Sequence, residues 1–191
     1  MSDGNNITEL LAAWHKGDRS VEEDLLRMVL PELRKIVHNA LYRPEASGLQ
    51  LQTTEMVSEL YIRLARASEK TNYKDRKHFY ALCARQIRQI LVDLYREKAA
   101  QKRGGGVDDL VLDPALIPVG DKGLSIVQLH DALADLEKID PEKARIVEQR
   151  VFVGLSNEEI AQLEEISAPT VKRRWKMAKA LLLQQLKSST E

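Results

Sequence analysis

The stretch Leu155–Leu186, LSNEEIAQLEEISAPTVKRRWKMAKALLLQQL, decides the fold of the C-terminal part of the chain. Ser156, followed three residues later by Glu159, forms a capping box that starts a short helix. Ser167 is a second N-cap, and Pro169 falls in the next first turn, where its missing N–H costs little. The sequence therefore predicts two helices joined by a tight turn.

The turn between these helices is predicted to need an unusual backbone. It falls at Glu165, four residues after Ala161, where a left-handed conformation would favour Gly. A glutamate adopts that conformation at some cost, so we expect a slightly altered turn.

The second helix combines an apolar stripe with positively charged faces. The stripe recurs at spacings of four, three, four and four residues and contains Val171, Trp175, Ala178, Leu182 and Leu186. The other faces carry Lys172, Arg173, Arg174, Lys176 and Lys179. A solvated face without a ligand is one interpretation of this charge. The two capped starts, and the polar Ser167 and Thr170 at the exposed helix start, favour a recognition helix that enters the DNA major groove.

The net charge of the 191-residue chain is zero, but the charge is segregated along it. Residues 76–103 hold eight basic and two acidic residues, a net of +6, and residues 168–191 hold six and one, a net of +5. Between them, residues 104–167 hold five and fourteen, a net of −9. Clustered positive charge is typical of phosphate binding, so the two basic blocks predict contacts with nucleic acid.

The apolar periodicity predicts an all-α protein with two helical domains. Helices are expected at residues 7–16, 21–41 (bent or split at Pro31), 53–67, 76–98, 125–136 and 140–153, before the helix pair described above. Residues 1–101 form the first domain and residues 125–191 form a four-helix second domain.

Residues 102–124 are predicted to be a flexible acidic linker. Lys102 to Gly123 holds five of the nine glycines and two of the six prolines. We expect this segment to leave the domains loosely coupled, and its acidic residues to shield the basic surfaces. These acidic residues are Asp108, Asp109, Asp113 and Asp121.

The helix predicted at 76–98 offers a second basic surface. Its solvent side can carry Arg85, Arg88, Gln89, Arg96 and Lys98. Phe79, Tyr80 and Tyr95 lie among these charges, and aromatic rings between arginines suit unpaired bases. Aromatic residues at helical spacing are also common in cores, so both interpretations stay open for Phe79 and Tyr80.

Three segments, in this order, give the chain a family resemblance. TTEMVSELYIRL (53–64), HFYALCARQIRQILVDLYREK (78–98) and the helix pair at 155–186 resemble bacterial RNA polymerase sigma factors of the extracytoplasmic-function class, which are sigma-70-like. The resemblance implies that the first segment binds the polymerase clamp, the second reads and melts the −10 element, and the third reads the −35 element. It implies core RNA polymerase and promoter DNA as partners, with an anti-sigma factor as a further candidate.

The resemblance also implies roles for single residues. Glu55, Glu59, Tyr61, Arg63 and Leu64 would lie at or beside the clamp contact. Tyr80, Arg85, Arg88, Gln89, Asp93, Arg96 and Lys98 would meet the −10 element, and Ser167, Thr170, Lys172, Arg173, Arg174 and Lys176 the −35 element. Arg88, Gln89 and Asp93 fall on an Arg-Asn-x-x-x-Asp pattern, with Gln in place of Asn. Leu82 stands where many relatives have Trp, so melting would depend more on Tyr80 or on the loop before His78.

Other classes of protein are less well supported. A stand-alone helix-turn-helix regulator, with residues 1–100 as a sensing or dimerising module, remains the alternative. An enzyme is disfavoured, because the four histidines are scattered and no nucleophile or metal motif accompanies them. The single Cys83 permits no intramolecular disulfide and no cysteine-based zinc site, and it is expected to be buried. We expect a cytoplasmic protein without a cofactor, a small-molecule substrate or a membrane partner.

Overall fold

The structure, a computed structural model, describes residues 9–10, 13, 16, 18–41, 53–68, 76–101, 111–112 and 124–188. Its N-terminal half contains η1 (Arg19–Val21), α2 (Glu22–Leu41), α3 (Thr53–Ser68) and α4 (Arg76–Gln101). Its C-terminal half contains α5 (Ile126–Ile139), α6 (Pro141–Glu148), η3 (Gln149–Val153), α7 (Asn157–Glu164) and α8 (Ala168–Ser188). The predicted all-α class is confirmed, while most of the helix expected at 7–16 lies outside the described residues.

Local sequence signals account for most helix boundaries. Ser125 and Gln128 form a capping box at the start of α5. Asp140 caps α6 by accepting the backbone N–H of Lys143 at 3.0 Å. Pro141 follows as the first helical residue, a position whose N–H has no acceptor within the helix, so the N–H that proline lacks is not missed. Pro31 neither splits nor ends α2, which continues on both sides of it.

The last turn of α6 widens into the π-helical segment η3. This segment ends at Gly154, which adopts the left-handed backbone (φ 80°, ψ 22°) that glycine tolerates best. A π segment shifts the side chains that follow it around the helix axis. Here it buries Val151, Phe152 and Val153 in succession.

One short element lies within the segment predicted to be a linker. Val111 and Leu112 form strand β1, which pairs antiparallel with β2 (Leu124–Ser125) at the start of α5. This pairing fastens part of the segment to the C-terminal half. Residues 102–110 and 113–123, with the four acidic residues expected to shield the basic surfaces, lie outside the described residues.

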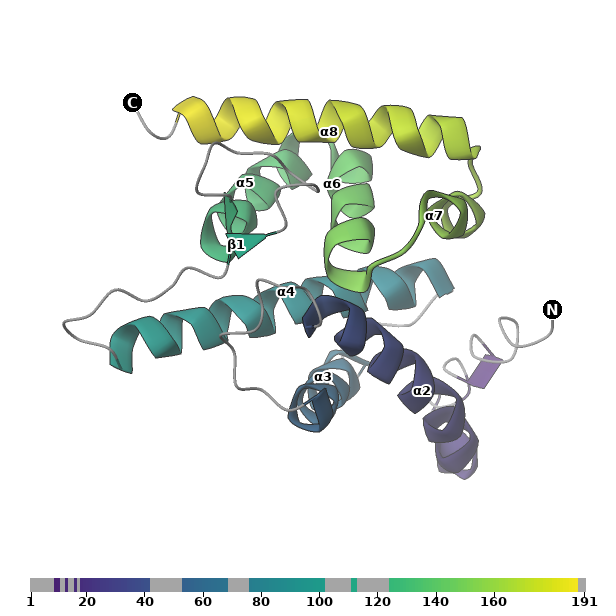
Figure 1. The fold of residues 1–191 in the computed structure, drawn as a ribbon. Coiled ribbons are helices and arrows are strands. Elements are labelled where there is room, and N and C mark those ends of the chain that lie inside the picture. The colour runs from purple at the N-terminus through teal and green to yellow at the C-terminus, as the bar shows by residue number, and fades with distance from the viewer. Residues whose placement is uncertain are drawn as a thin grey trace.

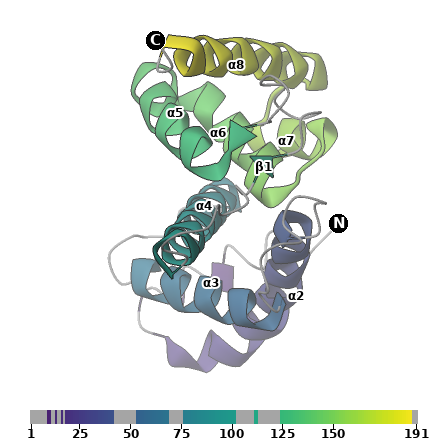
Figure 2. The same cartoon turned by 60° about the vertical axis from the view of Figure 1, so that its left-hand side comes forward.

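The helices are arranged in layers, with α4 near the middle of the molecule. In Figures 1 and 2, α8 forms one outer side, α5 to α7 lie beneath it, α4 follows, and α2 and α3 lie on the opposite side. Helix α4 contacts α5, α6, η3 and α7, and α2 also contacts η3. The two halves therefore pack against each other in this structure. That the linker leaves them loosely coupled in the free protein stays a prediction.

Candidate nucleic-acid and polymerase interfaces

Two capped helix starts fix the geometry of α7 and α8. The hydroxyl of Ser156 accepts the N–H of Glu159 at 3.1 Å, and the Glu159 carboxylate accepts the N–H of Ser156 at 2.8 Å. Glu165 adopts the predicted left-handed backbone (φ 57°, ψ 39°). The hydroxyl of Ser167 then accepts the N–H of Thr170 at 3.3 Å, which starts α8. The helix-turn-helix predicted from the sequence is confirmed.

The apolar stripe of α8 anchors the helix to the C-terminal half. Val171, Trp175, Ala178 and Leu182 are buried, and Leu186 is half-buried. Arg150 and Lys179 lie over the Trp175 ring, 5.1 and 5.4 Å from its centre. These cation–π contacts hold the indole in place and assign Lys179 to the packed side of the helix.

The residues predicted to contact the −35 element differ in their exposure and in their contacts within the protein. Lys172, Arg173 and Lys176 are exposed and form no ion pair within the described part of the chain. Arg174 is half-buried and pairs with Glu142 of α6 at 2.8 Å. Thr170 is half-buried, and its hydroxyl lies 2.9 Å from that of Ser167. The exposed cations therefore gather in the N-terminal part of α8, a helix that forms an outer layer of the molecule (Figure 1).

The residues predicted to contact the −10 element lie along α4, and most of them have partners in the protein. Arg85 forms an ion pair with Glu137 of α5. Arg88 is buried and lies 3.2 Å from Glu148 of α6. Gln89 donates a hydrogen bond to Asp93 at 2.8 Å. Further along α4, Arg96 is exposed, whereas the side chain of Lys98 is not described.

Tyr80 is a buried member of this set. It is only 4% exposed and donates a hydrogen bond to Glu32 of α2. The guanidinium of Arg76 lies over its ring at 5.4 Å. Burial, followed by the contact with Glu32, raises the pKa of the Tyr80 hydroxyl. In this arrangement the ring is buried, its hydroxyl is bonded to α2, and it is not available to stack on a base.

The residues predicted to bind polymerase occupy different sides of α3. Glu55 is exposed. Arg63 is half-buried and bonds to Glu59 at 2.7 Å and to Asp93 of α4 at 3.1 Å. Tyr61 is half-buried and Leu64 is buried, so both contribute to packing.

Sequence reasoning missed an apolar residue on the outer side of α3. Ile62 is 42% exposed. It lies two turns after Glu55 and one turn before the exposed Arg66, so the three side chains form one outward stripe. The sequence did hold a signal for this exposure, because Ile62 falls outside the helical spacing that joins the buried Val57, Leu60 and Leu64.

The comparison with protein families adds the decisive observation. The family model for ECF sigma factors matches residues 4–188 of the chain. The chain belongs to the ECF sigma factor family. No curated protein and no solved structure gives a significant match.

Membership of this family defines the general activity. The protein is a sigma factor, a regulatory DNA-binding protein that directs transcription initiation by RNA polymerase. Within the described residues, no group of His, Cys, Asp and Glu could hold a metal ion. The helices of this sigma factor that the structure describes are too short or too polar to cross a membrane. Cys83 is fully buried, as predicted, and burial raises the pKa of its thiol.

The sequence analysis did not predict the ion pairs that two further cations of this sigma factor form. Lys35 of α2 pairs with Glu159 at 3.7 Å, and Lys77 of α4 pairs with Glu164 at 2.7 Å. Both contacts join the N-terminal to the C-terminal half. No local sequence pattern predicts them, because each depends on how distant helices pack.

Proposed function

We propose that this sigma factor binds core RNA polymerase and directs promoter-specific initiation through the −10 and −35 elements. Helix α3 contacts the polymerase, α4 meets the −10 element and α8 enters the major groove at the −35 element. The proposal rests mainly on the N-terminal part of α8. There Lys172, Arg173 and Lys176 are exposed, while Trp175 anchors the opposite side of the helix.

We assign different roles to the residues of α8. The N-terminal residues of a recognition helix lie deepest in the groove, so Thr170, Lys172 and Arg173 are proposed to contact base edges. Lys176 lies further along and is proposed to contact phosphate. Arg174 shares its charge with Glu142, which supports a contact with phosphate at the rim of the groove.

The polymerase contact is proposed for the outward stripe of α3. Glu55 and Ile62 are exposed there, and an exposed isoleucine beside charged residues is a suitable centre for a protein interface. Glu59 and Arg63 lie at the edge of the stripe. Arg63 pairs with Glu59 and with Asp93 of α4, so it holds α3 against α4. Tyr61 and Leu64 stabilise α3 rather than touch the partner.

The experiment for this proposal is co-purification with core RNA polymerase. The double variant Glu55→Lys/Ile62→Glu should lose polymerase binding and keep its helicity by circular dichroism. Glu23→Lys is the matched control, since Glu23 is also exposed near a helix start but lies on α2. Unchanged polymerase binding by the double variant would exclude this surface of α3.

The same proposal sets the protein's location and one further partner. A factor that acts with core polymerase works in the cytoplasm, where bacterial transcription takes place. An anti-sigma factor is proposed as a regulator that competes with polymerase for α3. In a competition assay, such a regulator should be displaced by core polymerase and should fail to bind the Glu55→Lys/Ile62→Glu variant.

A further inference from the structure

Segment η3 contacts the first helix of the helix-turn-helix at both of its ends. The side-chain amide of Gln149 donates a hydrogen bond of 2.6 Å to the carboxylate of Glu164, the last residue of α7. The next residue, Arg150, donates a hydrogen bond of 2.5 Å to Oδ1 of Asn157, the first residue of α7. Two adjacent residues of η3 therefore bind opposite ends of one short helix.

The guanidinium of Arg150 extends this contact to the recognition helix. It lies over the ring of Trp175, 5.1 Å from the ring centre, and Trp175 is only 9% exposed. A planar guanidinium can donate a hydrogen bond within its plane while its face covers an aromatic ring. Arg150 is thus one side chain that joins η3, the start of α7 and the buried side of α8.

The backbone of η3 is unusual for a simple connection between helices. π-helical segments are rare and are frequently found at functional sites. Four of the five residues of η3 are buried, whereas Arg150 is half-buried. The residue that this segment directs to both α7 and α8 is therefore its charged one.

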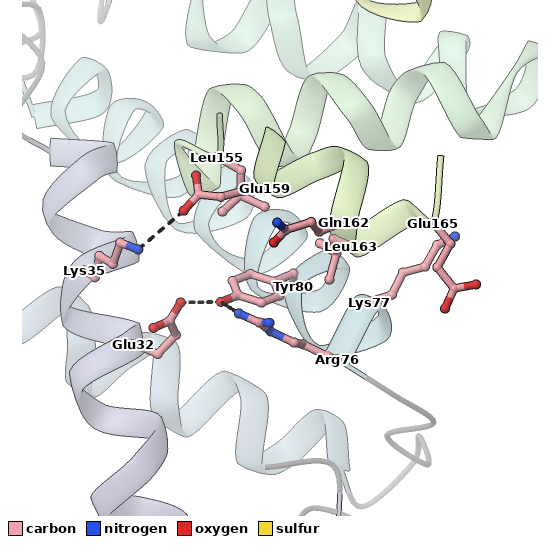
Figure 3. A pocket seen from close by; sticks show the side chains of 10 residues that line it. All are labelled: Glu32, Lys35, Arg76, Lys77, Tyr80, Leu155, Glu159, Gln162, Leu163 and Glu165. Carbon is pink, nitrogen blue, oxygen red and sulfur yellow. Dashed lines mark hydrogen bonds and ion pairs between the residues drawn. The ribbon is translucent and has the colours of Figure 1, made fainter. Parts of the chain in front are cut away.

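The side of α7 that faces the N-terminal half gives the helix little support. Figure 3 shows a pocket of about 480 Å³ between α2, α4 and α7, which Glu159, Gln162 and Leu163 of α7 line. Glu159 meets Lys35 there at 3.7 Å, and an exposed pair at this distance contributes little. The contacts at the two ends of α7 therefore matter most for its orientation.

We propose that Arg150 is a positioning residue for −35 recognition, which sets the angle between α7 and α8 through Asn157 and Trp175. Hydrogen bonds to base edges depend steeply on distance and angle, whereas contacts with phosphate carry no sequence information. A tilt of α8 therefore lowers the selectivity between −35 sequences more than the affinity for DNA in general. This effect on the −35 element rests on the proposed function of α8.

The test compares two cations that lie on the same ring. Arg150→Gln removes the link from η3 to Asn157 and Trp175. Lys179→Gln is the matched control: it also removes one positive charge beside the Trp175 ring, 5.4 Å from its centre, but Lys179 lies on α8 itself and joins no second element to it through this ring. Asn157→Ala removes the acceptor of the Arg150 hydrogen bond, and Asn157→Asp keeps an oxygen acceptor at the same place.

The first measurement is the selectivity of holoenzyme for the −35 element. The probes are a promoter duplex with the −35 sequence that wild-type holoenzyme selects from a randomised library, and the same duplex with that sequence scrambled. Arg150→Gln and Asn157→Ala should each lower the ratio of the two affinities about tenfold, as the loss of one base contact does, and the double variant should lower it no further. Lys179→Gln and Asn157→Asp should keep the ratio.

The second measurement is the fluorescence of Trp175 in chains whose other tryptophan, Trp14, is replaced by Phe. Asn157 acts on the indole only through Arg150, so Asn157→Ala should change the emission of Trp175 while Arg150 is present and should have no effect in the Arg150→Gln chain. An emission that Asn157→Ala leaves unchanged overturns the link between the two helices.

The outcomes separate the positioning role from the function on which it rests. An unchanged affinity ratio in Arg150→Gln and Asn157→Ala, with helicity retained, overturns the positioning role alone. If Arg150→Gln loses helicity, the ratio in Asn157→Ala decides. A wild-type holoenzyme that selects no −35 sequence overturns the proposed function of α8 and the positioning role with it.

Discussion

The guanidinium of Arg88 lies 3.2 Å from the carboxylate of Glu148, and both side chains are less than a tenth exposed. The contact is an ion pair without hydrogen-bond geometry, and Oε1 of Glu148 has no hydrogen-bond donor among the described residues. Burial raises the pKa of Glu148, and the charge of Arg88 opposes that rise. The pair thus joins the two halves through charges that have lost most of their water.

Removing one member of this pair should destabilise the protein more than removing both. Arg88→Leu leaves a buried carboxylate unpaired and should lower the free energy of unfolding by about 3 kcal/mol. Arg88→Leu/Glu148→Leu should stay within about 1 kcal/mol of the wild type, since leucines can fill the space. Urea unfolding followed by circular dichroism measures both values. Equal losses in the single and double variants would contradict a coupled buried pair.

The turn between α7 and α8 should become more stable with glycine. Glu165 has φ 57°, and a residue with a Cβ atom pays roughly 1–2 kcal/mol for a left-handed backbone. Glu165→Gly should raise the free energy of unfolding by about 0.5–1 kcal/mol. This gain is smaller than the relieved strain, because glycine also gives the unfolded chain more conformational freedom. Glu165→Ala removes the same carboxylate but keeps Cβ, and it should give no such gain in the same urea titration. A gain shared by both variants would attribute the effect to charge rather than to the backbone.

His130 should make stability depend on pH. It lies on α5, and burial, followed by the charge of Arg88, lowers its pKa below the ordinary 6.5. Arg96 acts in the same direction, while Asp131 and Asp93 oppose it.

A histidine with a lowered pKa binds its proton more readily in the unfolded chain. Its contribution to stability is therefore complete above pH 6.5 and falls as the pH drops through 6.5 toward the pKa of the folded state. His130→Gln cannot titrate and should flatten the decline. Parallel curves for the two proteins across this range would show that His130 does not titrate differently on folding.

Two cations of α8 should affect DNA binding by holoenzyme in different ways. Arg173→Ala should cost about 1–3 kcal/mol and relax the preference at one base pair of the −35 element. Lys176→Ala should weaken binding to all sequences alike and lower the salt slope by about one. The measurement is the affinity for −35 variants at several salt concentrations. Equal losses on every variant would refute the division of roles, and no loss in either would exclude α8 from the groove.

Local signals in the sequence predicted most of the helices and the turn. Apolar spacing and capping residues are properties of neighbouring residues, so α2, α3, α4 and α8 could be placed before their packing was known. The left-handed Glu165 followed from the geometry of the turn in the same way.

The relation between the two halves could not be predicted in that way. Tyr80 has the spacing of either a core or a surface aromatic residue, and only its contact with Glu32 on another helix decides between them. Nothing local distinguishes Glu148 from an exposed acid, because its burial depends on Arg88, sixty residues away. The π-helical step at η3 also has no sequence signature here, although the segment contacts α2 and α4 of the N-terminal half.

The most direct test of the central claim is DNA binding and run-off transcription with and without core RNA polymerase on a library of genomic fragments. The account predicts that the chain alone binds no fragment specifically, and that polymerase supplied with the chain starts at a defined set of promoters sharing −10 and −35 sequences. The Glu55→Lys/Ile62→Glu variant should abolish these starts. Specific binding to operator fragments by the free chain, with no effect on where polymerase starts, would contradict the account and identify a stand-alone regulator.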